Sequence, residues 1–141
     1  QCSAVADCII QEDNLNYEQE RAFRIVTNYS MVPKGTPLKM YIGGMGGTGK
    51  THVLQALIKY FHALNESHQL AIVAPTETAA ALIGGSTYHY MFGIHDSRGG
   101  EISNKLLGEV KSCLQGVDYI FFDEVSMPSC ADMYKISTHL C

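Results

Sequence analysis

The sequence predicts an α/β fold in which a parallel β-sheet is flanked by helices. Short apolar segments at residues 38–42, 70–74 and 117–122 have the length and composition of strands, and segments with helical spacing separate them. Strands that alternate with helices form parallel sheets through right-handed crossovers. A glycine-rich loop follows the first of these strands and an acidic pair follows the last, which indicates where the chemistry lies.

The N-terminal part of the chain is expected to hold one helix. Residues 1–14 show no clear period, so we expect an irregular lead-in there. Residues 15–29 predict a helix, because Asn16 suits the N-cap and Gln19 stands three positions later, where a capping box needs it. The apolar side of this helix is supplied by Phe23, Ile25 and Val26.

The rest of the chain alternates between strand-like and helix-like spacing. Two prolines and a glycine within residues 31–37 indicate a loop before the strand at 38–42. Residues 70–74 are continuously apolar, as expected of a strand that is buried on both faces of a sheet. Further helices are expected at residues 50–64, 77–83 and 103–114.

Residues 44–51 read Gly-Met-Gly-Gly-Thr-Gly-Lys-Thr, which is the pattern of a phosphate-binding loop, or P-loop. Glycines let successive N–H groups turn toward phosphate oxygens, and the following helix directs its positive N-terminus at them. Lys50 would reach the β and γ phosphates of ATP, and Thr51 would place its hydroxyl on Mg2+. The alternative is a glycine-rich turn without a chemical role, which the strand before it and the helix after it disfavour. The predicted nucleotide-binding residues of this loop are Gly44, Gly46, Gly47, Thr48, Gly49, Lys50 and Thr51.

An acidic pair, Asp123 and Glu124, directly follows the apolar segment 117–122. Nucleotide-binding α/β folds place their chemistry at this end of a strand. Asp123 would hold Mg2+ through water, and Glu124 would position and deprotonate the attacking water. A solvated strand end also carries such pairs, but the phosphate-binding loop upstream favours the catalytic interpretation. We therefore expect Lys50, Asp123 and Glu124 to be the catalytic residues.

Composition narrows the class of protein. The 141 residues carry a net charge of -4, which argues against a broad basic surface, so any nucleic-acid contact is expected to be confined to a groove.

Five cysteines without a C-x-x-C pair indicate free thiols. The chain shows no leader sequence and no apolar run of membrane-spanning length, so we expect a soluble intracellular protein. No metal-ligand spacing is found for His52, His62, His68, His95 and His139, which we expect to be surface or packing residues.

Four blocks of sequence carry a family resemblance. They are residues 15–23 (Leu-Asn-Tyr-Glu-Gln, then Ala-Phe), 44–51, 74–92 (Ala-Pro-Thr, then Gly-Ser-Thr-Tyr-His) and 123–127 (Asp-Glu-Val-Ser-Met). In this order they resemble the glutamine motif, the phosphate-binding loop, the single-strand-binding block and the Mg2+ and base motif of the Pif1-type DNA helicases. The Ser-Met after the acidic pair is more distinctive than the pair alone.

The resemblance implies a P-loop NTPase of the RecA-like class, truncated here to its N-terminal ATP-binding domain over residues 15–141. It implies that Gln19 recognises the adenine edge of ATP. It also implies that Thr76, Thr87 and His89 lie near single-stranded DNA, although for His89 an aromatic cluster packed on the sheet is an equal candidate. The second motor domain, with its arginine finger, is expected to be missing, and the resemblance implies a nuclear protein.

One residue departs from the family pattern. Glu77 stands where the family usually has glycine after Ala-Pro-Thr. A carboxylate would repel a DNA phosphate beside it, which argues against a DNA contact at this position. Alternatively, Thr76 caps the next helix and Glu77 lies in its first turn, where the helix dipole favours an anion.

The function that these observations favour is an ATP-dependent DNA helicase of Pif1 type, in which ATP hydrolysis drives movement on single-stranded DNA. This chain is expected to supply the ATP-binding half, with little activity by itself. Two alternatives are an inactive nucleotide-binding remnant of a mobile element and another kind of P-loop ATPase. The single-strand-binding block and the Ser-Met after the acidic pair disfavour the last.

Overall fold

A computed structural model describes residues 1–33, 35–43, 49–87, 90–91, 104–123 and 134. The chain divides into two compact units, Gln1–Ser67 and His68–Cys141, which we describe one at a time. Within the described residues, no helix is both long and apolar enough to cross a membrane.

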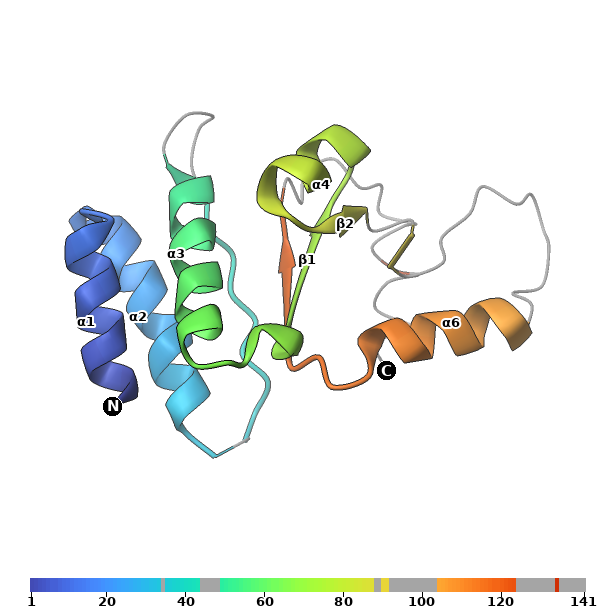
Figure 1. Ribbon diagram of the computed structural model, residues 1–141, viewed down its shortest axis with the longest axis horizontal. Helices are drawn as coiled ribbons and strands as arrows, with labels where there is room; N and C mark the ends of the chain where they lie inside the picture. Colours follow the sequence, from blue (N-terminus) through green and yellow to red (C-terminus); the bar gives the residue numbers. More distant parts are fainter. Residues whose placement is uncertain (34, 44–48, 88–89, 92–103, 124–133, 135–141) are drawn as a thin grey trace. The chain divides into compact units, whose positions relative to one another are not determined.

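The first unit contains three helices, α1 (Cys2–Glu12), α2 (Tyr17–Met31) and α3 (Lys50–Ala63), which pack against one another (Figure 1). Helix α1 corrects the irregular lead-in expected over residues 1–14. Its buried residues, Ala6 and Ile9, are too few to reveal a helical period in the sequence, and its N-terminus lacks a side-chain cap. Contacts with α2 and α3 therefore stabilise α1 more than its own sequence does.

Aromatic side chains form the core of the first unit. Phe23 of α2 and Tyr60 of α3 are fully buried and pack edge to face, with ring centroids 5.9 Å apart. Tyr60 also packs edge to face against Phe61, at 5.5 Å. Burial raises the pKa of the Tyr60 hydroxyl, which stays protonated and lies 3.3 Å from Ser30 Oγ. Of the three apolar residues expected to line α2, Ile25 is the exception, since it is 41% exposed.

The second unit confirms the predicted parallel sheet. A 3-10 turn, η1 (Ser67–Gln69), leads into strand β1 (Leu70–Ala74), which lies between β2 (Ser86–Thr87) and β3 (Tyr119–Phe122). Both pairings are parallel. The predicted helices are present as α4 (Glu77–Ile83) and α6 (Asn104–Leu114) (Figure 1).

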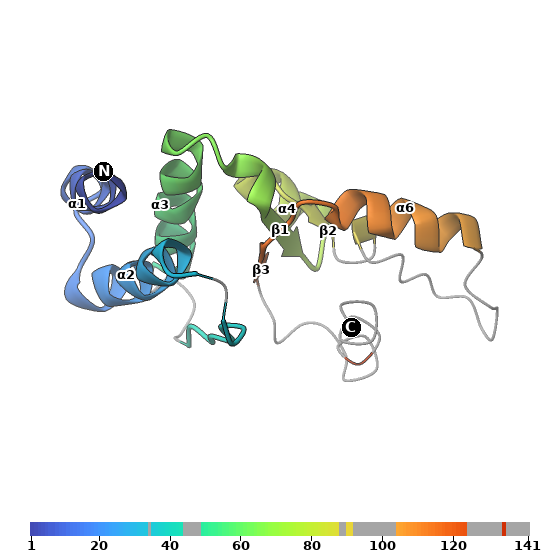
Figure 2. The same ribbon diagram turned by 90° about the horizontal axis from the view of Figure 1, so that it is seen from below.

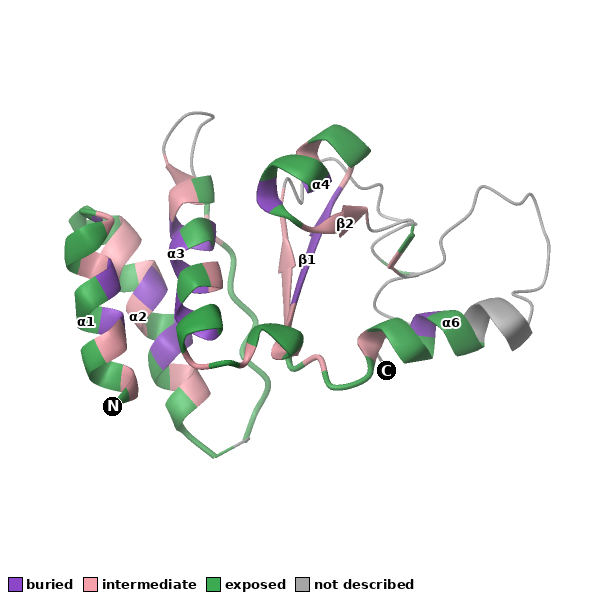
Figure 3. Ribbon diagram, in the orientation of Figure 1, coloured by how far each residue is buried: buried purple, intermediate pink, exposed green. Residues whose placement is uncertain are grey.

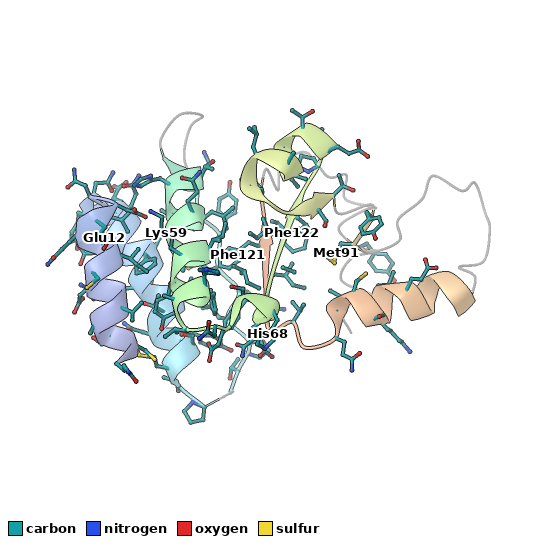
Figure 4. All side chains as sticks on the ribbon, viewed as in Figure 1. Glu12, Lys59, His68, Met91, Phe121 and Phe122 are labelled. Atoms are coloured by element: carbon teal, nitrogen blue, oxygen red, sulfur yellow. The ribbon has the colours of Figure 1, made fainter. Side chains whose placement is uncertain are left out.

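Strand β1 is the buried centre of this sheet, as its continuous apolar sequence predicts. Val73 is packed by partly buried apolar side chains from β3, α6 and residue 91. Two of these side chains, Met91 and Phe122, are labelled in Figure 4. Strand β2 passes so close to β1 that a Cβ at Gly85 would lie 2.5 Å from the Ile72 carbonyl oxygen. Glycine at position 85 therefore permits the pairing of β2, a two-residue strand that the sequence did not indicate.

The structure contradicts the strand expected at residues 38–42. This segment has irregular backbone, and Leu38, Met40 and Tyr41 are exposed (Figures 2 and 3). A strand requires a neighbour for its N–H and C=O groups, and none of the described strands pairs with it. The hydroxyl of Tyr29 holds the preceding loop instead, donating to the Thr36 carbonyl at 3.0 Å and accepting from the Leu38 N–H at 3.3 Å.

Candidate nucleotide-binding site

The N-terminus of α3 has the geometry of an anion-binding helix end. Gly49 is the N-cap and adopts a left-handed conformation, with φ of +83°, that favours glycine. As glycine it provides no side-chain cap for the helix, and the first N–H groups of a helix are the ones that can bind an anion. Lys50 and Thr51 are the first two residues of the helix, and Thr51 is exposed. Residues 44–48, which include four predicted ligands of phosphate, lie outside the described residues.

Gln19 connects the start of α2 to this helix end. The predicted capping box is present: the Gln19 N–H donates to Asn16 Oδ1 at 2.9 Å, and the Asn16 N–H donates to Gln19 Oε1 at 3.0 Å. In addition, Gln19 Nε2 donates to the Gly49 carbonyl at 3.3 Å. The structure therefore brings Gln19 to the phosphate-binding loop, although 30 residues separate it from Gly49.

The close approach of Gln19 is a second constraint that favours glycine at position 49, in addition to the positive φ. A Cβ at position 49 would lie 2.3 Å from Gln19 Nε2. A side chain there would displace the amide and also strain the backbone. The two contacts of Gln19 set which way its amide faces, because its oxygen must accept and its nitrogen must donate. With respect to the residues that the structure describes, one N–H and one lone pair of the amide are then left for a ligand.

The described residues at this helix end suit a nucleoside triphosphate with Mg2+. Backbone N–H groups at a helix N-terminus and a lysine can bind phosphate, and a threonine hydroxyl is an oxygen ligand that Mg2+ accepts beside phosphate oxygens. In the part of the chain that is described, no group of three or more His, Cys, Asp or Glu side chains could hold a metal ion by itself. Mg2+ bound beside a nucleotide usually takes some of its ligands from phosphate oxygens.

The second unit gathers its predicted site residues at one edge of its sheet. Val73 of β1 pairs with Phe122 of β3, and the N–H of Asp123 donates to the Val73 carbonyl at 2.9 Å. Asp123 therefore extends β3 at its carboxyl end, half-buried. Thr87 ends β2 opposite Ala74 of β1, which places it at the same edge.

Thr76 follows β1 at this edge and caps α4, as one of the two sequence interpretations predicts. Its hydroxyl accepts the N–H of Ala79 at 3.2 Å. Glu77 is exposed in the first turn of α4, where the helix dipole favours a negative charge. The position of Glu77 is thus explained by the N-terminus of α4 and does not require a contact with DNA.

The predicted site residues fall into two groups. Gln19, Gly49, Lys50 and Thr51 lie in the first unit, whereas Thr76, Thr87 and Asp123 lie in the second. The pairing of Asp123 with Thr51 around Mg2+ stays a prediction. Glu124 and His89 lie outside the described residues, as do Gly44, Gly46, Gly47 and Thr48.

One contact near the site was missed in the sequence. His52, which we expected to be a surface or packing residue, lies with its Nε2 2.8 Å from the carbonyl oxygen of Asp13. Asp13 also pairs through its side chain with Lys59 of α3. No motif marks Asp13, and its partners are 39 and 46 residues away in sequence, so only the fold could reveal them.

Comparison with known proteins shows the family. The model of the PIF1-like helicases matches residues 14–137. Among curated proteins, the chain is 36% identical over 119 residues to ATP-dependent DNA helicase PIF4 of Trypanosoma brucei brucei, covering 80% of this chain and 13% of the relative. It is 37% identical over 123 residues to ATP-dependent DNA helicase PIF1 of the same organism, covering 87% of this chain and 11% of the relative.

ATP-dependent DNA helicase RRM3 of Saccharomyces cerevisiae is 32% identical over 123 residues, covering 80% of this chain and 15% of the relative. The chain therefore spans between 11% and 15% of the length of these relatives. No solved structure matches it. The family match covers the glutamine motif, the phosphate-binding loop and the acidic pair, and with the identities above it establishes that this chain belongs to the PIF1-like helicase family.

Proposed function

We propose that this chain is the ATP-binding part of an ATP-dependent DNA helicase that uses ATP hydrolysis to move along single-stranded DNA. The observation that carries the proposal is the contact between Gln19 and Gly49 at the N-terminus of α3. It brings a side chain able to read a nucleobase next to a helix end able to bind phosphate. The names of the relatives, which are all ATP-dependent DNA helicases, support the same function.

In this proposal the protein mainly positions ATP and stabilises charge, because phosphoryl transfer requires little covalent chemistry from the protein. Lys50 contacts the β and γ phosphates, Thr51 and Asp123 hold Mg2+, and Glu124 deprotonates the attacking water. The backbone N–H groups of the phosphate-binding loop surround the phosphates.

The free N–H and lone pair of the Gln19 amide match adenine. Adenine presents an amino donor beside the N7 acceptor, whereas guanine presents two acceptors, O6 and N7. The Gln19 oxygen would face the guanine O6, with no proton between the two atoms. We therefore expect ATP to bind more tightly than GTP.

We further propose that Thr76, Thr87 and His89 contact single-stranded DNA at the carboxyl edge of the sheet. In this proposal a second motor domain supplies the arginine that completes catalysis, and the protein acts in the nucleus in DNA repair and recombination. Resemblance to the helicases, rather than any contact in this chain, supports these parts of the proposal.

The proposed function is tested by replacing Lys50 with alanine. Loss of a charge-assisted contact to phosphate should weaken Mg-ATP binding by about 2 kcal/mol, roughly a thirtyfold rise in Kd, measured by calorimetry. Lys111→Ala, an exposed lysine on α6, is the matched control and should bind as the unsubstituted chain does. Equal affinity of the unsubstituted chain and Lys50→Ala would remove Lys50 from the site.

A second prediction concerns Glu77 and DNA. If α4 begins near the DNA backbone, Glu77→Gln should tighten binding of a labelled single-stranded oligonucleotide by about three- to tenfold at low salt, because a repulsive charge is removed. Fluorescence anisotropy at several salt concentrations measures this. Glu109→Gln makes the same change on the exposed side of α6 and serves as the control. If Glu77→Gln binds single-stranded DNA with unchanged affinity, Glu77 stabilises the helix terminus and does not lie near DNA.

A further inference from the structure

Asp13, the C-cap residue directly after α1, attaches the turn between α1 and α2 to helix α3. Its side chain is only 8% exposed and forms an ion pair with Lys59 Nζ of α3. Its carbonyl oxygen lies 2.8 Å from His52 Nε2, which donates to it in the tautomer that carries a proton there. In Figure 4, Lys59 reaches toward the end of α1 that carries Glu12, the residue before Asp13.

The two partners of Asp13 lie on one face of α3. His52 and Lys59 are seven residues apart, about two helical turns, and so project in nearly the same direction. Gly49, which accepts the hydrogen bond from Gln19, lies about one turn before His52 on this face. The stretch from Asp13 to Gln19 therefore meets α3 at three points that span about 15 Å of the helix.

These three contacts differ in strength. The Gln19–Gly49 hydrogen bond measures 3.3 Å, slightly beyond the usual range for N–H to O, so it holds the two elements loosely by itself. The carboxylate of Asp13 is largely shielded from solvent, its partner Lys59 is 54% exposed, and a charge-assisted hydrogen bond is stronger than a neutral one. Asp13 thus adds two contacts with α3, one of them charged, to the single neutral contact that Gln19 makes.

We propose that Asp13 is a positioning residue for nucleotide selection: by fixing the start of α2 on α3, it sets the distance between Gln19 and the phosphate-binding helix end. This inference rests on the proposed function, because it assumes that Gln19 contacts adenine while the α3 terminus binds phosphate. A triphosphate without a base should bind independently of Asp13, whereas discrimination between ATP and GTP should require it.

A purely structural role of Asp13 is the competing explanation. His52 contacts the Asp13 carbonyl and Lys59 the Asp13 carboxylate at the negative end of α1, and these contacts would stabilise the helix end whether or not a nucleotide binds. Arg24 provides the comparison, because it bridges Asp7 of α1 at 2.9 Å and Glu20 of α2 at 2.7 Å. The hydrogen bond to the Glu20 carboxylate, followed in size by the one to Asp7, raises the pKa of the Arg24 guanidinium. Loss of Arg24 should loosen α1 from α2 but leave α2 placed on α3.

The experiment compares Asp13→Asn/Lys59→Met with Arg24→Met in the full chain. The double variant removes both charges together, so neither is left buried and unpaired. Calorimetry gives the Kd values of Mg-ATP, Mg-GTP and Mg-tripolyphosphate, and thermal melting reports stability. The unsubstituted chain and Arg24→Met should prefer ATP over GTP by about tenfold or more, as a hydrogen-bonding base site predicts. The double variant should keep its tripolyphosphate affinity within about twofold and lose most of the preference for ATP.

Two further variants keep the inference testable if the double variant does not fold. Lys59→Arg preserves the ion pair and should retain the preference for ATP. His52→Phe preserves the ring and the ion pair but removes the hydrogen bond to the Asp13 carbonyl, so the preference should fall. Failure of the unsubstituted chain to bind ATP would overturn the proposed function itself. Binding of ATP with no preference over GTP, or an unchanged preference in the double variant or in His52→Phe, would overturn the role of Asp13.

Discussion

Replacing Phe23 with alanine is expected to destabilise the helical first unit by about 4 kcal/mol. Phe23 is fully buried, and its ring packs against Tyr60 at a centroid distance of 5.9 Å, so the change leaves a cavity and removes an aromatic pair. A small domain has only about 5–15 kcal/mol of stability in total. Amide hydrogen exchange in α2 and α3 should therefore accelerate by about three orders of magnitude.

Tyr17→Ala is the control for this prediction. Tyr17 begins the same helix but is 79% exposed, so its removal leaves no cavity and should change the free energy of unfolding by less than about 0.5 kcal/mol. Because α2 also carries Gln19, Phe23→Ala should lower ATP affinity together with stability. Slow exchange in Phe23→Ala, equal to that of Tyr17→Ala, would show that the core does not depend on this aromatic pair.

The substitution Glu124→Gln is expected to reduce ATP turnover by about 100-fold or more, with ATP still bound. Glutamine keeps the size of the side chain but cannot accept the proton of the attacking water. The comparison requires steady-state ATP hydrolysis with single-stranded DNA present, and calorimetry with ATP for the same variant. A fall in turnover at constant affinity identifies a group that acts in the chemical step.

The matched control is again Glu109→Gln, which makes the same chemical change on the exposed surface of α6. It should leave turnover within about twofold of the unsubstituted chain. Hydrolysis by Glu124→Gln at the normal rate would transfer the role of base to another residue. An inactive nucleotide-binding remnant, the alternative function, would bind ATP but show no turnover that Glu124→Gln could reduce.

The sequence was most informative where local chemistry decides the structure. Asn16 and Gln19 predicted a capping box because both hydrogen bonds join residues three positions apart. The strand at 70–74 followed from its continuous apolar composition, and α3 followed from apolar residues that recur at helical spacing after the glycine-rich loop. In each case the determining residues are close together in the chain.

The sequence was least informative where distant contacts decide the structure. Helix α1 forms through packing on α2 and α3, and β2 forms because glycine at position 85 lets it approach β1. Residues 38–42 have a strand-like composition, but composition does not supply a partner strand. In the site, resemblance identified Gln19, whereas its contact with Gly49 and the two contacts of Asp13 emerge only from the folded chain.

The Gln19 amide serves both the capping box of α2 and the contact with Gly49, which limits the residues that position 19 can accept during evolution. A capping box accepts glutamate or glutamine at this position, so selection on the helix alone would tolerate either residue. Glutamate, however, has no N–H for the Gly49 carbonyl, and its charge would oppose a bound triphosphate. If the proposed role of Gln19 holds, a related sequence with glutamate at position 19 would keep the helix cap but lose the contact with Gly49 and bind ATP less well.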